Sequence, residues 1–212
     1  MRLSRICIVR HGETAWNAEK RLQGQLDIAL NPAGLAQAEA AAHWLSGQPV
    51  AALYSSDLQR AQQTAASIAR ALGLSPVLLA AMRERRYGLF EGLTYAEARA
   101  LHPLLYHAFE QRAPDFAVPV GGESLRQLYQ RVTVCLDEIA SRHPGQTVVL
   151  VTHGGVLDII NRFVRGNPLE MPRDFLIPNA GISCVSRSDG VWQIEAWAET
   201  AHLSAASRDE LP

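Results

Sequence analysis

Two histidines stand in matching sequence settings, and both could bind or attack an anionic group. His11 follows the apolar run 6–9, His153 follows the β-branched run 147–151, and a glycine comes directly after each histidine. Glycine lets the backbone approach a ligand closely, and ligands of open α/β sheets bind beyond the carboxyl ends of the strands. A single histidine at a strand end is more often structural than functional. The repeated setting, with Arg10 before one histidine, predicts that the two face each other across one anion site.

Metal chemistry is the main alternative for a histidine-containing chain, and the spacing argues against it. The seven histidines form no HxxxH or HExxH pattern, and His102 and His107 are five residues apart. Cys7, Cys135 and Cys184 lie far apart in apolar runs, which is typical of buried thiols rather than of zinc or redox sites. The phosphate-binding pattern GxxxxGK[ST] is also absent. We therefore expect no metal ion and no cofactor.

Hydrophobic periodicity predicts the elements that would position these histidines. Strands alternate with helices along most of the chain, which predicts an α/β fold: a three-layer α/β/α sandwich with a mostly parallel central sheet. Asn31 is expected to cap the first long helix, residues 55–57 to cap the second, and Gly73 to end it. Strands are expected at 3–9, 50–54, 77–80, 147–151, 182–186 and 191–197, and helices at 32–46, 58–72, 123–142 and 156–164.

The segment at about 81–122 differs from the rest of the chain. It contains Pro103, Pro114 and Pro119 among charged and aromatic residues, so short helices and loops are expected there. We predict a single domain, 1–212, with this helical insertion. A turn at 188–190 should join the last two strands, and the last ten or so residues are polar enough to be disordered.

The composition limits the classes of partner. The 212 residues include 20 Lys and Arg against 21 Asp and Glu, for a net charge of −1. This balance indicates neither a nucleic-acid-binding face nor a polybasic membrane patch. No stretch is long and apolar enough for a signal peptide or a membrane span. We expect a cytoplasmic protein without nucleic acid or membrane as a partner, and a homodimer is left open.

Beyond the histidines, ordered motifs over roughly residues 3–200 resemble the signature of the histidine phosphatase superfamily, which includes cofactor-dependent phosphoglycerate mutases. A single Arg-His-Gly triplet would be weak evidence, whereas the ordered set is strong. The matching motifs are Ile8-Val9-Arg10-His11-Gly12-Glu13-Thr14 with Trp16-Asn17, then Leu30-Asn31 with Gly34 and Gln37-Ala38, then Ser55-Ser56-Asp57-Leu58-Gln59-Arg60-Ala61 with Thr64-Ala65, then Arg83-Glu84 with Tyr87-Gly88 and Glu91-Gly92, and last Val151-Thr152-His153-Gly154-Gly155.

The resemblance implies a role for each residue of a phosphoryl-transfer site. His11 would attack phosphorus and form a phosphohistidine, so its other ring nitrogen should be held by a backbone carbonyl. Arg10 and Arg60 would clamp the phosphoryl oxygens, His153 would be a further donor, and Asn17 would add a neutral one. Arg60 also falls in the first turn of a predicted helix, where a cation opposes the dipole unless an anion lies nearby.

A general acid and a set of substrate contacts complete the implied site. Glu84 would protonate the leaving oxygen and then activate water, although its run of charged neighbours alone would suggest only a solvated face. Glu13 is a rival acid that matches a less critical family position. The expected phosphate- or substrate-binding residues are Asn17, Gln23, Gly24, Arg85, Tyr87 and Gly154, with Arg86 and Arg112 as further candidates for holding the rest of the substrate.

The sequence favours a phosphatase over a mutase, with evidence on both sides. The run Glu84-Arg85-Arg86-Tyr87-Gly88 resembles the mutase loop, usually Glu-Arg-His-Tyr-Gly. Against a mutase, the insertion lacks the adjacent arginine pair that mutases use for the substrate carboxylate, and His153-Gly154-Gly155 departs from the usual His-Gly-Asn. The short chain also predicts little C-terminal cover, and water access favours hydrolysis.

The expected function is therefore a phosphatase that hydrolyses a small phosphorylated metabolite through a phosphohistidine on His11. A cofactor-dependent phosphoglycerate mutase is the alternative. A non-catalytic module that only binds phosphate ligands is the remaining possibility. Degenerate modules of that kind usually lose the nucleophile or the acid, and both His11 and Glu84 are present.

Overall fold

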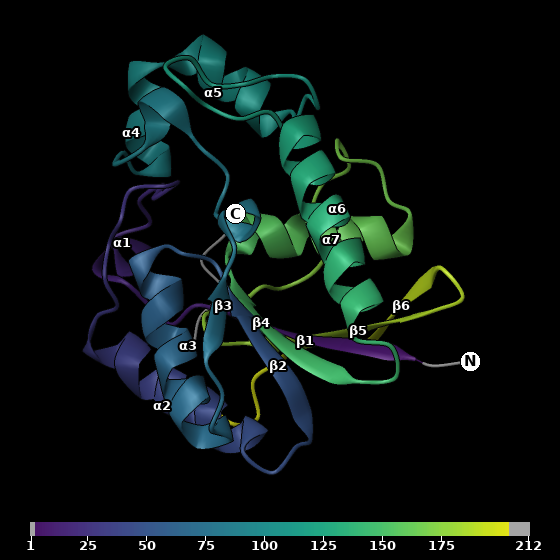
Figure 1. The fold of residues 1–212 in the computed structure, drawn as a ribbon. Helices are drawn as coiled ribbons and strands as arrows, with labels where there is room; N and C mark the ends of the chain where they lie inside the picture. The colour runs from purple at the N-terminus through teal and green to yellow at the C-terminus, as the bar shows by residue number, and fades with distance from the viewer. Residues whose placement is uncertain (1–2, 204–212) are drawn as a thin grey trace.

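A six-stranded sheet forms the centre of the computed structural model, which describes residues 3–203 (Figure 1). The strand order is β3-β2-β4-β1-β5-β6, with parallel pairing from β3 to β1 and antiparallel pairing from β1 to β6. The predicted mostly parallel sheet is confirmed. The strands are β1 (Ser4–Arg10), β2 (Val50–Ser55), β3 (Pro76–Leu78), β4 (Thr147–Thr152), β5 (Ile182–Ser188) and β6 (Val191–Glu199).

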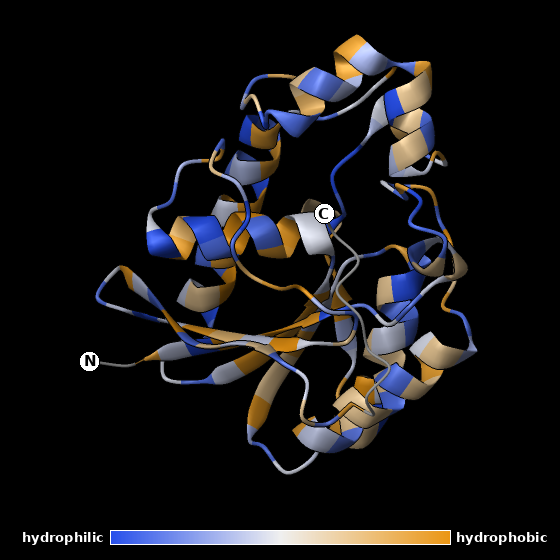
Figure 2. Cartoon of the chain, turned by 180° about the vertical axis from the view of Figure 1, so that it is seen from behind, coloured by the Kyte–Doolittle hydropathy of each residue, from blue (hydrophilic) through white to orange (hydrophobic). Residues whose placement is uncertain are grey.

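Helices cover both faces of this sheet, as a three-layer sandwich requires. Apolar side chains of α2 and α3 pack on one face, and those of α6 and α7 pack on the other. The central strands β1 and β4 are buried on both faces over their apolar runs 6–9 and 148–151, and hydrophobic residues follow the strands of the sheet (Figure 2). The α-helices are α1 (Ala15–Ala18), α2 (Pro32–Leu45), α3 (Gln59–Leu72), α4 (Tyr95–Leu101), α5 (Pro103–Glu110), α6 (Leu125–Arg142) and α7 (Gly154–Arg165).

Two of the three predicted helix caps are confirmed, and two helix starts are shifted: α6 begins at Leu125 rather than at 123, and α7 begins at Gly154 rather than at 156. Asn31 caps α2 by accepting a hydrogen bond from the Gly34 N–H, and Gly73 ends α3 in the left-handed conformation. The predicted cap of α3 by residues 55–57 is wrong, because Leu58 holds the N-cap position and makes no side-chain cap. The Ser56 hydroxyl instead forms a hydrogen bond with His153.

The predicted insertion forms a small layer of its own above the carboxyl edge of the sheet. It consists of the 3-10 turns η1 (Ala80–Met82) and η2 (Gly88–Phe90), followed by α4 and α5 (Figure 1). Phe90 is completely buried in a separate apolar cluster with Tyr106 and Val118. The insertion is therefore packed around its own core.

Several smaller predictions concern the rest of the chain. Asp189 and Gly190 take positive φ in the turn between β5 and β6, as the hairpin signal predicted. All three cysteines are buried and free. The polar tail predicted to be disordered begins close to residue 203 and lies mainly outside the described residues. Within residues 3–203, no helix combines the length and the apolar character that a membrane crossing requires.

Candidate active site

The two predicted histidines meet at the carboxyl ends of two neighbouring strands. Arg10 of β1 is in register with Thr152 of β4, so the residues that follow each of them emerge side by side. The ring centroids of His11 and His153 are 5.2 Å apart, and both side chains are almost completely buried. The parallel pairing of β1 with β4 therefore creates the juxtaposition that the sequence predicted.

His11 is held as a neutral ring with a free lone pair. Its Nδ1 is 2.7 Å from the Gly12 carbonyl oxygen, which can only accept, so Nδ1 carries the proton. Nε2 is then unprotonated, as a nucleophile requires. Burial lowers the pKa of His11 well below its usual value, and the nearby charges of Arg60 and Arg10 lower it further. The predicted backbone carbonyl partner is thus present.

His153 has the same tautomer but directs its proton differently. Its Nε2 lies 2.7 Å from Ser56 Oγ, which already accepts a hydrogen bond from the Leu58 N–H at 3.3 Å. With Ser56 assigned as the donor of this bond, Nε2 accepts it and the ring proton of His153 lies on Nδ1. Nδ1 is buried and has no partner among the described residues. Burial first, and the charge of Arg60 second, lower the pKa of His153 well below its usual value, so the ring is neutral.

Two buried guanidinium groups provide positive charge beside the histidines. Arg60, from the first turn of α3, donates to the carbonyl oxygens of Leu26 and Gly24 at 2.9 and 2.8 Å. Its Nε is buried without a partner among residues 3–203, and burial lowers its pKa to about 10. Arg10 donates to the Ile177 carbonyl at 2.5 Å. Two buried guanidinium groups that line one cavity are an arrangement that can bind an anion.

Glu84 reaches the site from the loop that follows η1. Its Oε1 accepts a hydrogen bond from the Arg85 N–H at 2.7 Å, and its Oε2 accepts one from the Gly155 N–H at 2.9 Å. A Cβ at position 155 would overlap Glu84 Oε1, so only glycine permits this approach at the start of α7. The rival acid Glu13 points elsewhere, because its carboxylate accepts from the Asn31 amide at the start of α2.

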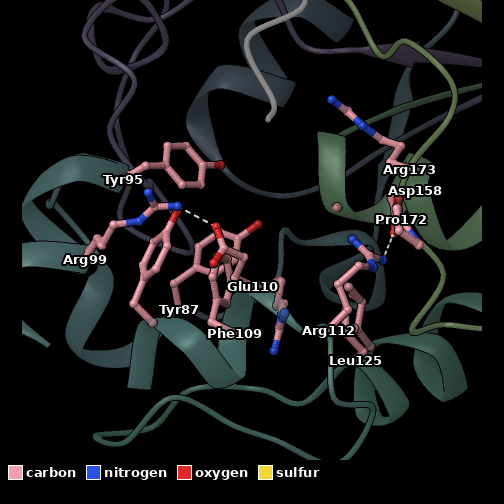
Figure 3. Close-up of a pocket in the computed structure, with 14 residues that line it drawn as sticks. Tyr87, Tyr95, Arg99, Phe109, Glu110, Arg112, Leu125, Asp158, Pro172 and Arg173 are labelled. Atoms are coloured by element: carbon pink, nitrogen blue, oxygen red, sulfur yellow. Dashed lines mark hydrogen bonds and ion pairs between the residues drawn. The ribbon is translucent and has the colours of Figure 1, made fainter. Parts of the chain in front are cut away.

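Two cavities share the wall formed by Tyr87 and Tyr95. The smaller, of about 40 Å³, contains most of the predicted site residues, and the larger, of about 370 Å³, extends under the insertion (Figure 3). Burial raises the pKa of both tyrosines, and the charge of Glu84 raises it further, so both hydroxyls are protonated donors. The small cavity is lined by Arg10, His11, Asn17, Arg21, Leu22, Gln23, Gly24, Arg60, Glu84, Tyr87, Tyr95 and Gly154.

The remaining predicted substrate contacts have different positions. Arg85 lines the larger cavity, where its guanidinium lies over the Phe109 ring. Arg112 lines it too, but forms an ion pair with Asp158 at 2.5 Å. Arg86 is exposed, donates to Gln25 and lines neither of these two cavities, and its role as a substrate contact stays a prediction.

The sequence did not single out Ser56 or Tyr95 for the site. Ser56 has a motif signal, because it belongs to the arginine motif that precedes Arg60, but it was interpreted as a helix cap. Tyr95 has no signal, since only the fold of the insertion brings it to the cavity. Among residues 3–203, no group of three or more His, Cys, Asp and Glu side chains could hold a metal ion.

Comparison with known proteins agrees with this geometry. The family model of the histidine phosphatase superfamily (branch 1) matches residues 6–200. The chain belongs to the histidine phosphatase superfamily. Among its relatives is phosphoglycerate mutase-like protein 4 of Arabidopsis thaliana, 42% identical over 93% of this chain and 86% of the relative. The metal-independent phosphoserine phosphatase of the same plant is 40% identical over 96% of this chain and 84% of that protein.

The same fold is found in a solved structure that is named as a phosphatase. A mycobacterial glucosyl-3-phosphoglycerate phosphatase superposes with a TM-score of 0.83 at 30% identity, covering 94% of this chain and all of the other. Relatives of this superfamily member therefore include proteins named as phosphatases and one named as mutase-like.

Proposed function

We propose that the protein is a phosphatase that hydrolyses a small phosphomonoester through a phosphohistidine on His11. The observation that carries the proposal is the state of His11: a neutral ring, unprotonated on Nε2, that lines a small cavity together with two buried guanidinium groups. A phosphoryl group in that cavity would be close to a nucleophile and to positive charge at once. Covalent catalysis of this kind divides one difficult displacement into two easier ones.

In the first half-reaction, His11 Nε2 attacks phosphorus and the bond to the leaving oxygen breaks. Arg10, Arg60 and the Nδ1–H of His153 stabilise the charge on the three equatorial oxygens. Asn17 contributes its amide nitrogen, because its Oδ1 already accepts from Thr14. In the second half-reaction, water attacks the phosphohistidine and His11 is regenerated.

Glu84 acts on the oxygen opposite His11 in both halves. It delivers a proton to the leaving oxygen in the first and removes one from water in the second. Two backbone N–H groups fix its carboxylate at the start of α7. These bonds hold the acid in place before substrate arrives, so little reorganisation is needed during the reaction.

The larger cavity suggests what the rest of the substrate is. Among the described residues that line it, four are arginines, Arg85, Arg99, Arg112 and Arg173, and two are carboxylates, Glu110 and Asp158. A tail with an acidic group suits this excess of positive charge, and the protonated tyrosines at the junction suit an oxygen acceptor. The relatives named for phosphoserine and glucosyl-3-phosphoglycerate also have acidic monoesters in their names.

A phosphoglycerate mutase is the second candidate. The loop sequence of residues 84–88 and the relative named mutase-like favour it. Against it, the insertion lacks the adjacent arginine pair that mutases use for the substrate carboxylate, and His153-Gly154-Gly155 departs from the usual His-Gly-Asn. A cytoplasmic location and a homodimer also remain predictions.

Trapping the phosphoenzyme tests the mechanism. Acid-labile label should appear on His11 after rapid quench with a labelled monoester, and His11→Ala should abolish both label and turnover. Activity that survives in His11→Ala would contradict the proposal. Phosphate release should then be compared with phosphoglycerate interconversion, with and without bisphosphoglycerate. Fast interconversion with negligible release would replace the phosphatase by the mutase.

A further inference from the structure

Every N–H group of the Arg131 guanidinium, in α6, donates a hydrogen bond. Nη1 donates to the carbonyl oxygens of Ala81 and Arg83, both at 2.8 Å, and Nη2 donates to the carbonyl of Glu84 at 3.1 Å. The two remaining donors form a bidentate pair with Glu123, at 2.6 Å from Nε and 2.8 Å from Nη2. All five donors of the side chain are therefore occupied.

Glu123 reinforces the same segment with its backbone. Its N–H donates to the Arg86 carbonyl at 2.9 Å, and its own carbonyl accepts from Arg85 Nε at 2.8 Å. The Glu123 carboxylate also neutralises and orients Arg131. Glu123, just before α6, and Arg131, within α6, thus contact the backbone or side chain of five positions between 81 and 86.

The acid loop, residues 83–87, has other supports that act through its side chains. Arg83 forms a bidentate ion pair with Asp57, and Arg85 Nη2 donates to the Phe116 carbonyl. The loop passes from η1 to η2 without belonging to a strand, so its carbonyl groups have no ladder or helix partners. The Thr152 hydroxyl donates to the Met82 carbonyl, and the Gln25 side-chain amide donates to the Glu84 carbonyl, which also accepts from Arg131. The carbonyls of Ala81 and Arg83 have Arg131 as the partner that fixes them to the rest of the fold.

We infer that Arg131, oriented by Glu123, is the positioning residue that sets where the Glu84 carboxylate lies. The inference rests on the proposed function, in which Glu84 is the acid. Arg131 bonds to the loop backbone and to Glu123 and lines neither of the two cavities at the site, and its charge also contributes to the lowered pKa of His153. The planar fork of arginine is needed because three carbonyls and a carboxylate must be bonded in one plane, which the three donors of lysine cannot reproduce.

The readout that separates positioning from general support is the leaving group. An alkyl monoester needs a proton for its leaving oxygen, whereas 4-nitrophenyl phosphate departs as a stabilised anion and needs little acid help. In single-turnover experiments, Arg131→Gln should slow phosphoenzyme formation from an alkyl monoester by roughly 30- to 100-fold, which is the loss of rate expected when the general acid is misplaced. The same variant should slow the reaction of 4-nitrophenyl phosphate by less than about threefold.

Matched variants keep the result interpretable. Arg126→Gln removes another bidentate arginine of α6, paired with exposed Asp115, and should change neither rate. Glu123→Gln should reproduce the selective loss more weakly, and it serves if Arg131→Gln does not fold. In a Glu84→Gln background, Arg131→Gln should add almost no further loss, because the acid it positions is already absent.

Equal slowing with both substrates, or additive losses in the double variant, would overturn the inference. A measurement independent of turnover separates this from failure of the proposed function. The N–H groups of Arg85 and Gly155 are bonded to the Glu84 carboxylate, so their hydrogen exchange should accelerate in Arg131→Gln but not in Arg126→Gln. Unchanged exchange would overturn the positioning role whatever the enzyme hydrolyses. A wild-type protein that forms no phosphoenzyme would overturn the proposed function instead.

Discussion

His11 and His153 carry their ring protons on the same atom, yet they offer opposite chemistry to a phosphoryl group. In His11 the Nδ1 proton is bonded to the Gly12 carbonyl, so the lone pair on Nε2 faces the site. In His153 it is Nε2 that is bonded, to Ser56, so the Nδ1 proton is available. One ring is thereby suited to attack and the other to donate, and a single hydrogen bond decides which.

Ser56→Ala should therefore damage the reaction without touching the nucleophile. Without the hydroxyl, nothing fixes the tautomer of His153, and a ring protonated on Nε2 would present a lone pair to the phosphoryl oxygens. We expect kcat to fall about tenfold, the value of one hydrogen bond, and the Nδ1 proton signal of His153 to be lost from nitrogen NMR spectra. Ser55→Ala, which removes a buried hydroxyl bonded to a backbone carbonyl, is the control. A retained tautomer with an unchanged kcat would contradict the argument.

Among the elements, the start of α7 carries a contact that depends on the absence of a side chain. Gly155 donates its N–H to Glu84 and leaves room for the carboxylate. Gly155→Ala should displace Glu84 and lower kcat for alkyl monoesters by about a hundredfold. The helix itself should gain up to about 1 kcal/mol, because alanine costs less backbone entropy than glycine.

Measured together, activity and thermal unfolding of Gly155→Ala distinguish a lost contact from a lost fold. Gly47→Ala is the matched control, since a Cβ there meets no atom within 4 Å. The control should retain full activity. Full activity in Gly155→Ala would show that the Glu84 carboxylate does not need the observed approach.

The elements also show which site residues could be predicted from the sequence and which could not. The strand ends that carry His11 and His153 were predictable, because their apolar runs and glycines are local signals. Arg131 was not, because an arginine in the middle of an amphipathic helix has the pattern of a solvated face. Its bonds to residues 81–84 depend on how the insertion folds back on α6. Arg86 lies apart from the two cavities, whereas its neighbours Arg85 and Tyr87 line them, because neighbours in an extended loop point in different directions.

For the whole molecule, placing two neutral histidines in the interior links the site to global stability. Both rings are buried at the centre of the fold, where α3, α7 and the sheet meet. Their pKa values are lowered well below the ordinary 6.5, chiefly by burial. The arrangement that makes His11 a nucleophile therefore makes the folded state unable to accept protons that the unfolded chain accepts readily.

This difference should appear as a loss of stability in mild acid. Above pH 6.5 both states hold these rings neutral, so they contribute no pH dependence. As the pH falls below 6.5, the unfolded chain binds protons and the folded chain does not, so the free energy of unfolding should fall by about 1.4 kcal/mol per pH unit for each histidine. Partly buried His202, whose pKa burial also lowers, should add a smaller share.

Denaturant titrations between pH 6.5 and 5 measure this loss before the carboxylates contribute. The pKa values of Asp57 and Asp115 are lowered from 3.8 by their arginine partners, so those groups act only in stronger acid. A double variant, His11→Asn with His153→Asn, should flatten the slope. A slope that persists in the double variant would place the titrating groups elsewhere, and would remove the link between the neutral state of His11 and the stability of the fold.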